Sequence, residues 1–488
     1  MRADVIVEGC TPLASVEAFP PGLAVLPNDR RLAVMSQSGP NGFVVFDVFG
    51  TRPRLLSTHT LGVDSDGDLR DDAATLLAVR GAALYPVMGE IQALDDDLAL
   101  ASTSNYEQVL AFDPTTGGPI PVTLSLPAAL PDIGLPLFPE PGAQATRTGI
   151  STLACVFPTD AFDSMGRPIA PEPRCDATRA SFLTNLTAGK ARAGGRLFVA
   201  TSNLPGGVRF LPGTVLVFDW LEHAGAIEVR PSPTTPVLFT SGFNPTGVAS
   251  FRTAGGRELV LVTITGAIGG GVGPSNVLTE AFVDVIDPSV PRIVATIPLD
   301  FAGPSFDAPA IDPTGRIAWL GASSSRQLYA IDLRVLDDPR LYEAGQDPVR
   351  LDGQSIGGLD ARIFTGDRPL VLPPRSDGRA AIDCEGLTDV TINAAGTEVF
   401  ASDFCDGTIT RVALDLDGST DAPYPGERFR VIAQQNSFAP NDAVGELRSP
   451  GTLVVRPGIP GVDYTSPDVL VALGQPDPQL CGVRVESR

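Results

Sequence analysis

Short apolar strands separated by turn residues recur along the chain. In the first copy, an apolar strand at residues 22–26 leads into a Pro-Asn-Asp-Arg turn, and a strand of small and β-branched residues follows at 32–36. A third strand at 43–47 ends in Phe-Asp, and a fourth follows at 54–58. Strands of this length, bounded by turn signals, are typical of an all-β protein.

The same unit can be traced seven times. Repeats of one sheet-forming unit indicate that each sheet buries its faces against its neighbours. Runs such as Leu259-Val-Leu-Val, apolar on both faces, fit strands that are covered on both sides. The sequence therefore predicts one domain over residues 1–488, a seven-bladed β-propeller of four-stranded antiparallel blades. The other six copies lie at residues 91–113, 195–219, 247–297, 308–332, 387–415 and 452–486.

These copies resemble the repeats of YVTN/lactonase-like propellers. In that family a Pro-Asp-Gly turn and a strand precede a strand of the type Val-x-Val-Ile-Asp, which is similar to Phe282–Asp287 in this chain. The second copy departs from the pattern, with Asp95-Asp-Asp97 at the turn. The resemblance spans nearly the whole chain and implies the propeller fold. It leaves function open, because propellers include enzymes, receptors and scaffolds.

The ends of the chain are expected to close the ring. The seventh copy is one strand short, and the N-terminal strand at residues 3–8 has no blade of its own. We predict that this strand is the outer strand of the last blade. Long segments between the copies are expected to carry recognition, because loops of this length are usually functional or disordered. They are residues 64–86, 119–188, 266–280 and 334–381.

A hairpin suggests the first of three cysteine pairs. If its turn is Asn393–Gly396, Val390 faces Val399 and Cys384 faces Cys405. Six paired cysteines would indicate an oxidising compartment, so the expected location is extracellular, periplasmic or the outer cell surface.

Two further pairs complete the set. Antiparallel pairing of the two terminal strands places Cys10 beside Cys481, and Cys155 is then left with Cys175 inside one insertion. Buried free thiols are the alternative interpretation of all six residues.

The charge of the chain narrows the choice of partners. The formal net charge is −22, and an acidic surface repels phosphate backbones, so nucleic acid is not an expected partner. No apolar run approaches the roughly 18 residues of a membrane helix, and no signal peptide is visible. Hydrophobic residues make up 43% of the chain, enough for a large core.

An aspartate-rich segment in the first insertion predicts a calcium site. Its carboxylates recur at positions one, three, five and nine of a loop, a pattern that surrounds a hard cation with oxygen ligands. The departure is Leu69, where a calcium loop normally has glycine, and an exposed acidic turn is the alternative. The predicted ligands of Ca²⁺ are the carboxylates of Asp64, Asp66, Asp68 and Asp72 and the backbone carbonyl of Arg70.

The chain lacks the residues of several common enzymes. It has two histidines, and neither a Gly-x-Ser-x-Gly elbow nor a phosphate-binding loop is present. The leading interpretation is an exported or cell-surface propeller that binds a protein or cell-surface ligand through one face and its insertions. A structural subunit of an extracellular assembly is a second possibility.

The resemblance also leaves room for catalysis. Propeller lactonases use Ca²⁺ or an acidic central site, so a calcium-dependent lactonase-type hydrolase is a third interpretation. Residues just before the innermost strands would then converge at the mouth of the central channel, although such residues can also merely cap strand ends. The candidates are Glu90, Asn244, Asp307 and Glu385.

Overall fold

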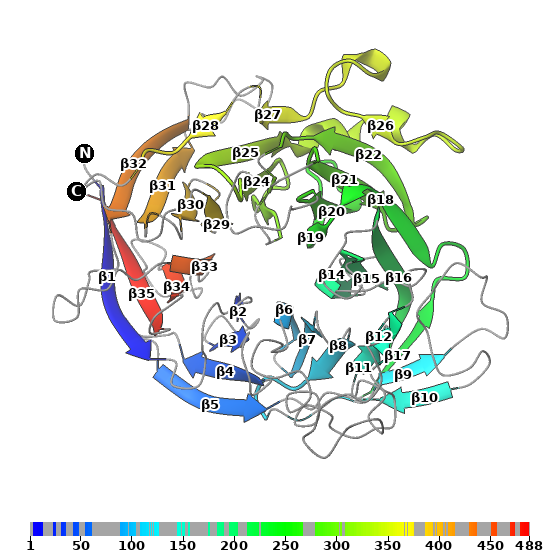
Figure 1. Ribbon diagram of the computed structural model, residues 1–488, viewed down its shortest axis with the longest axis horizontal. Helices are drawn as coiled ribbons and strands as arrows, with labels where there is room; N and C mark the ends of the chain where they lie inside the picture. The colour runs from blue at the N-terminus through cyan, green and yellow to red at the C-terminus, as the bar shows by residue number, and fades with distance from the viewer. Residues whose placement is uncertain are drawn as a thin grey trace.

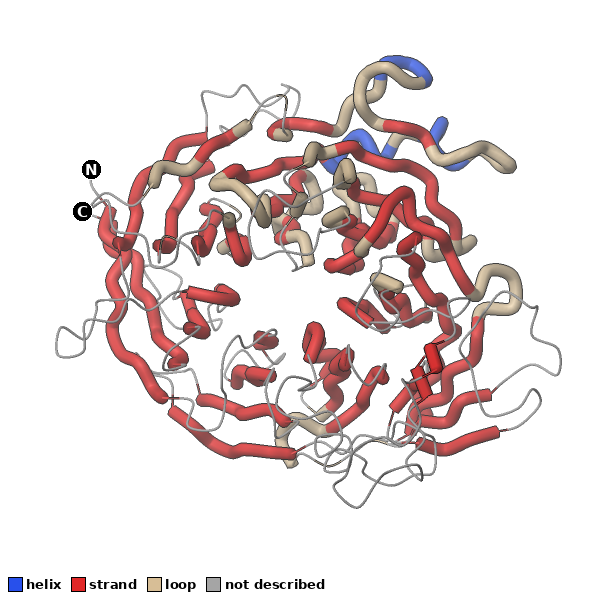
Figure 2. Tube along the Cα trace, viewed as in Figure 1, coloured by secondary structure: helices blue, strands red, loops and turns tan. Residues whose placement is uncertain are grey.

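The computed structural model is a ring of β-sheets around a central axis (Figure 1). Strands dominate the part of the chain that is described, and short 3-10 helices stand at one side of the ring (Figure 2). The described residues are 3–12, 23–25, 31–35, 42–47, 54–60, 88–95, 97–103, 108–116, 118, 120, 122–125, 144–147, 149–151, 155–156, 174–175, 183–189, 195–203, 212–223, 226–266, 279–301, 303–304, 308–365, 367, 369–374, 386–393, 396, 398–403, 406, 408–414, 429–436, 450–455, 469–473 and 479–487.

Five sheets are antiparallel throughout and four strands deep from the axis to the rim. Each sheet is named here by its second strand from the axis. In the β24 sheet, two short strands share the outermost position, and both pair with β25. The five sheets comprise β2 (Leu23–Val25), β3 (Arg31–Met35), β4 (Gly42–Asp47) and β5 (Arg54–Thr60); β6 (Met88–Asp95), β7 (Leu98–Thr103), β8 (Gln108–Phe112) and β11 (Gly149–Ser151); β23 (Ala310–Ile311), β24 (Ile317–Gly321), β25 (Gln327–Asp332), β27 (Arg362–Phe364) and β28 (Leu370–Val371); β29 (Leu387–Ile392), β30 (Glu398–Asp403), β31 (Thr408–Leu414) and β32 (Phe429–Asn436); and β33 (Pro450–Val455), β34 (Val469–Leu473), β35 (Gln479–Ser487) and β1 (Ala3–Pro12).

Two larger sheets, the β15 and β20 sheets, each contain a parallel pair at the outer side. In one, β9 runs parallel to β17, and in the other β26 runs parallel to β22. A separate two-stranded sheet pairs β12 (Cys155–Val156) with β13 (Arg174–Cys175). The larger sheets comprise β14 (Leu183–Gly189), β15 (Arg196–Thr201), β16 (Pro212–His223), β17 (Ala226–Pro231), β18 (Val237–Phe243), β9 (Val122–Ser125) and β10 (Gln144–Arg147); and β19 (Pro245–Arg252), β20 (Glu258–Ile264), β21 (Phe282–Asp287), β22 (Arg292–Pro298) and β26 (Val349–Arg350).

The prediction of seven four-stranded antiparallel blades is therefore wrong. The described strands form five blades of that kind rather than seven, and the β15 and β20 sheets depart from it. The physical reason lies in the segments 119–188 and 334–381, which were expected to be insertions between blades. They supply β9, β10 and β26, which extend the outer edges of the two larger sheets.

The N-terminal strand closes the ring, as predicted. β1 pairs antiparallel with β35, from Ala3 opposite Ser487 to Pro12 opposite Gln479. The two ends of the chain accordingly lie side by side (Figure 1). This register places Cys10 opposite Cys481, and the pairing of β12 with β13 places Cys155 opposite Cys175. Backbone register is compatible with disulfide bonds at both places, and the bonds themselves stay predictions.

The register predicted for the β29–β30 hairpin is wrong. Val390 lies opposite Ala401 instead of Val399, because the turn is longer than Asn393–Gly396. Its ends are joined by the bond from the Asn393 N–H to the Glu398 carbonyl, at 3.0 Å. Cys384 and Cys405, which the wrong register brought together, lie outside the described residues.

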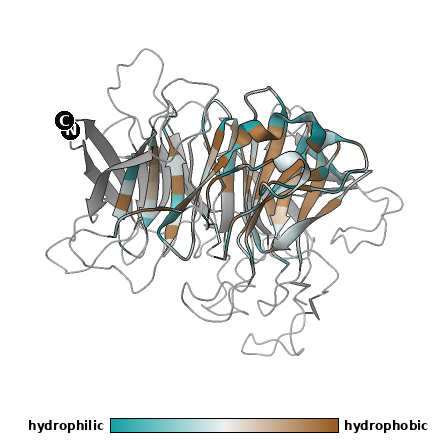
Figure 3. Ribbon diagram, turned by 90° about the horizontal axis from the view of Figure 1, so that it is seen from above, coloured by the Kyte–Doolittle hydropathy of each residue, from teal (hydrophilic) through white to brown (hydrophobic). Residues whose placement is uncertain are grey.

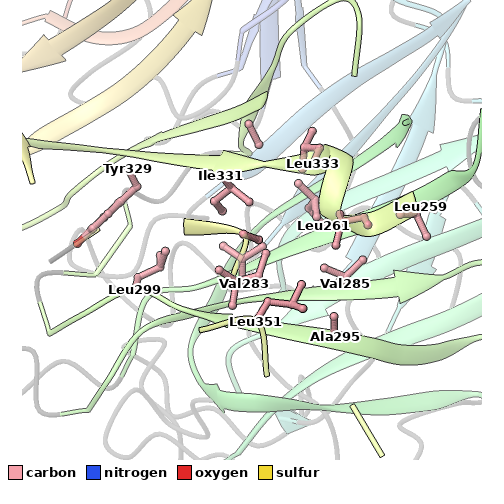
Figure 4. Close-up of a cluster of buried hydrophobic side chains, with 14 of the residues drawn as sticks. Leu259, Leu261, Val283, Val285, Ala295, Leu299, Tyr329, Ile331, Leu333 and Leu351 are labelled. Atoms are coloured by element: carbon pink, nitrogen blue, oxygen red, sulfur yellow. The ribbon is translucent and has the colours of Figure 1, made fainter. Parts of the chain in front are cut away.

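The core lies between neighbouring sheets. Phe198 and Val217 of the β15 sheet share a buried cluster with Val262 of the β20 sheet. The opposite face of the β20 sheet packs on the β24 sheet, and Figure 4 shows Val283 and Val285 lying near Ile331 and Leu333 in this cluster. Seen from the side, hydrophobic residues follow the strands of the ring (Figure 3). Each apolar face is therefore covered by the adjacent sheet, which is what stabilises a propeller.

Turns between inner strands also join the β20 and β24 sheets. The turn before β20 is held by Asp337, whose carboxylate accepts the Thr253 hydroxyl at 2.5 Å and the Gly255 N–H at 2.9 Å. Asp337 ends the 3-10 helix η4 (Leu333–Asp337), which is followed by η5 (Pro339–Tyr342) and η6 (Ile356–Gly358). Gly315 approaches the same turn, and an added Cβ there would lie 2.1 Å from the Arg252 carbonyl oxygen.

Gly315→Ala should destabilise the protein more than Gly256→Ala. Both glycines have positive φ, +65° and +87°, so both alanines carry backbone strain of about 1 kcal/mol. Only Gly315 has a neighbouring carbonyl that a Cβ would strike, and this clash adds about 1–3 kcal/mol to the loss of folding stability. Urea unfolding of the two variants measures the difference. Equal losses would show that the turns of adjacent sheets are not in tight contact.

Candidate functional site: the hydroxyl-rich end of the ring

Buried hydroxyl groups gather where the second strands of the sheets end. We call this place the hydroxyl-rich end: the end of the ring at which β15, β20, β24 and β30 finish. Strand ends leave backbone groups without ladder partners, and short hydroxyl side chains can satisfy them. The fully buried hydroxyl residues beside the ends of β15, β20 and β30 are Thr201, Ser202, Thr263, Thr265 and Ser402.

One hydrogen bond ties the β15 sheet to the β20 sheet. The Ser202 hydroxyl donates to the side-chain carbonyl of Asn244 at 2.6 Å, and both residues are buried. Asn244 immediately precedes β19 and has φ +59°, a left-handed conformation that asparagine tolerates better than most residues. Asn203 has a similar φ of +51°, and its amide donates to the Pro212 carbonyl at 2.7 Å. The two asparagines therefore shape the chain and link the sheets.

A second chain of hydrogen bonds ties the β20 sheet to the segment that precedes β23. The Thr246 and Thr265 hydroxyls are 2.7 Å apart, and the Thr265 hydroxyl donates to the Pro304 carbonyl at 3.1 Å. Close by, the Ser323 N–H donates to the Gly303 carbonyl at 2.7 Å. Side chains and backbone thus hold Gly303 and Pro304 in place between these two sheets.

An ion pair ties the β24 sheet to the β30 sheet at the same end. Arg326 Nε lies 2.9 Å from a carboxylate oxygen of Asp406 and 3.7 Å from one of Asp403. Both carboxylates are buried, with side chains 7% and 4% exposed, so a cation beside them offsets the cost of burying their charge. The Leu387 N–H adds a bond to the Ala322 carbonyl at 2.8 Å.

A buried carboxyl group lies deeper, between the β15 and β20 sheets. Asp284 in β21 accepts the N–H and the hydroxyl of Ser241 from β18, at 2.8 and 2.6 Å, and the hydroxyl of Thr296 at 2.8 Å. Loss of hydration raises the pKa of Asp284 from 3.8 to about 6, although the bonds from Ser241 and Thr296 oppose the shift. Sequence reasoning missed this residue. The available signal was one aspartate inside the apolar run Val283-Asp-Val-Ile.

The structure describes only part of the sites predicted from the sequence. Asn244 lies at the predicted position before an innermost strand, and its side-chain oxygen is occupied by Ser202. Glu90 belongs to β6, with its side chain outside the described residues. Asp307, Glu385 and the calcium-ligand segment 64–72 also lie outside them. Convergence of the four channel-mouth candidates and calcium binding therefore stay predictions.

The described residues hold no group of three or more His, Cys, Asp or Glu side chains that could bind a metal ion. In the same part of the chain, no helix is long and apolar enough to cross a membrane. What the hydroxyl-rich end does offer is a set of hydrogen-bonded links between three successive pairs of sheets.

Comparison with known proteins adds little to this picture. No family model matches the chain, and no curated protein matches its sequence. Among solved structures, the β-propeller domain of Cps50 (Swd1) from Myceliophteria thermophila is similar over 98% of this chain and 100% of that chain, at 10% identity and a TM-score of 0.48. A likeness at this TM-score carries no argument, and the similarity to YVTN/lactonase-like repeats stays a resemblance.

Asp284→Asn should change how stability depends on pH. Because the pKa is higher in the folded protein than the ordinary value of 3.8, stability from this group is fully present below about pH 4 and is lost as the pH rises through 6. Asparagine carries no charge, so at pH 8 the variant avoids a penalty of up to about 3 kcal/mol for a shift of about two units. It should gain stability relative to wild type between pH 4 and pH 8.

Chemical unfolding across this pH range is the measurement. Asp367→Asn serves as the control, because that side chain is 79% exposed and its removal alters the charge without relieving burial. Parallel stability curves for wild type and Asp284→Asn would contradict the assigned pKa.

Proposed function

We propose that this propeller is a scaffold that binds a partner protein at the hydroxyl-rich end of the ring. The observation that carries the proposal is an exposed aromatic residue next to a residue that is held by a hydrogen bond. Phe301, which follows β22 at this end, is 64% exposed. Its neighbour Asp300 accepts a hydrogen bond from the buried Tyr329 hydroxyl. Aromatic residues presented on a preorganised surface are common anchors of protein interfaces.

The surrounding frame supports binding better than catalysis. The Ser202 hydroxyl and the Asn244 amide oxygen are engaged with each other, and the Thr265 hydroxyl is bonded to the Pro304 carbonyl. Groups engaged in this way hold the loops in place. Loops on a rigid scaffold are the usual location of recognition residues.

The rest of the proposal concerns location and metal. We propose export on the basis of the opposed pairs Cys10–Cys481 and Cys155–Cys175, which favour an oxidising compartment. Peptide mapping without reductant tests this, and free thiols at these positions would contradict it.

Calcium at residues 64–72 is tested by titration calorimetry on chelated protein, where an absence of binding heat would contradict the site.

A photo-cross-linking amino acid at position 301 should capture a partner in the cells that make the protein. The same amino acid at position 290 is the matched control, because Val290 is 62% exposed in the turn between β21 and β22, at the opposite end of the ring. Adducts specific to position 301, identified by mass spectrometry, are the expected result.

The purified partner then gives a quantitative test. Phe301→Ala should weaken its binding at least tenfold, a change of about 1.4 kcal/mol, whereas Val290→Ala should leave it unchanged. Equal adducts at the two positions, or equal affinities of the two variants, would contradict the proposed face.

A further inference from the structure

The fourth strands from the axis share a β-bulge in several sheets. In β5, Leu55 lies opposite Phe46 and Ser57 opposite Val45, so Leu56 is the extra residue. β22 has the same irregularity one residue after Ile293. A β-bulge of this kind places one strand's extra residue outside the regular pairing.

The two bulges occupy equivalent places in their sheets. Asp47 pairs with Arg54 before the first bulge, and Asp287 pairs with Arg292 before the second. In each strand the extra residue comes two positions after that arginine. It is Leu56 in β5 and Val294 in β22, and the two residues are therefore structural equivalents.

The protein covers the bulge of β22 with its own chain. Val294 is 1% exposed and belongs to the same buried cluster as Val349 and Leu351. β26 lies beside the bulge, parallel to β22, with Val349 opposite Ala295 and Arg350 opposite Thr296. Figure 4 shows Leu351 next to Ala295 and Val283. A short extended segment with two aliphatic residues two positions apart thus completes the outer edge of the β20 sheet.

Among the described strands, none pairs with the equivalent edge of the β3 sheet. Leu55 and Leu56 are each 43% exposed, against 1% for Val294. In the part of the chain that is described, β5 is the last strand of its sheet. An edge strand with adjacent exposed leucines is a surface that proteins normally cover or protect.

We propose that β5 is a docking site for an extended segment of a partner protein, which adds in parallel to β5 as β26 adds to β22. The segment would present two aliphatic side chains two positions apart, the spacing of Val349 and Leu351, to Leu56, since Val294, its equivalent in β22, shares a buried cluster with that pair. Strand addition of this kind takes its affinity from main-chain hydrogen bonds and its specificity from alternate side chains.

A second copy of the chain fits this edge less well than a partner does. Two-fold symmetric pairing of β5 with itself would be antiparallel, whereas the cover that the protein builds on β22 is parallel. Two copies, each with a formal net charge of −22, also repel one another.

The probe is a fluorescently labelled peptide with the sequence of residues 345–353, which contains Val349 and Leu351. We expect saturable binding to the full chain in an anisotropy titration. The protein variant Leu56→Ser should bind it at least fivefold more weakly. Val290→Ser, at an exposed residue of another sheet, should bind it as wild type does. A peptide with serine at both aliphatic positions should not bind.

Thermal melts show whether Leu56→Ser is folded. If its melting temperature equals that of wild type, weaker peptide binding results from the change at the β5 surface and not from unfolding. No saturable binding, equal binding of the serine peptide, or equal binding by Leu56→Ser would overturn the proposal. Sedimentation equilibrium should give a monomer. A dimer that Leu56→Ser dissociates would assign the edge to a second copy and would also overturn it.

Discussion

Burial of each sheet against its neighbours is the constraint on which the rest of the molecule depends. The β20 sheet illustrates it: one face packs on Phe198 and Val217 of the β15 sheet, and the other packs on Leu320 and Tyr329 of the β24 sheet. A single sheet of this size would leave both apolar faces in water, so its stability comes from the sheets on either side. Pairing of β1 with β35 completes the terminal sheet and closes the ring.

Mutual burial has a cost at the ends of the strands, where polar groups leave water as well. The Ser202–Asn244 and Thr265–Pro304 hydrogen bonds offset this loss of hydration, and they also join the sheets. The hydrogen bonds of Asp284 offset the loss of hydration only in part, so the pKa of this carboxyl group rises to about 6. The same frame that satisfies these groups also holds Phe301 exposed at the rim, which is why structure and proposed recognition share one end of the ring.

The sequence predicted whatever depends on local pattern. Apolar runs such as Leu259-Val-Leu-Val marked strands that are fully buried, and the missing strand of the last copy identified β1 as its partner. What it could not predict depends on contacts between distant residues. β26 has two residues and no periodicity, so nothing local indicates that it extends another sheet. The β29–β30 register failed because turn length was judged from four residues instead of from the Asn393–Glu398 bond. Similarly, Asn244 was selected by its place before a strand, whereas its partner Ser202 lies in another sheet.

The interdependence of the sheets can be measured with the two tryptophans of the chain. Trp220 in the β15 sheet and Trp319 in the β24 sheet are both almost fully buried, and the β20 sheet lies between them. Trp319→Phe leaves fluorescence that reports on the first sheet, and Trp220→Phe leaves fluorescence that reports on the second. In urea, each variant's fluorescence transition should coincide with its own loss of β-sheet circular dichroism, because neither sheet is stable without its neighbours. A fluorescence transition clearly separated from the circular dichroism transition in either variant would contradict the account, since that sheet would then unfold on its own.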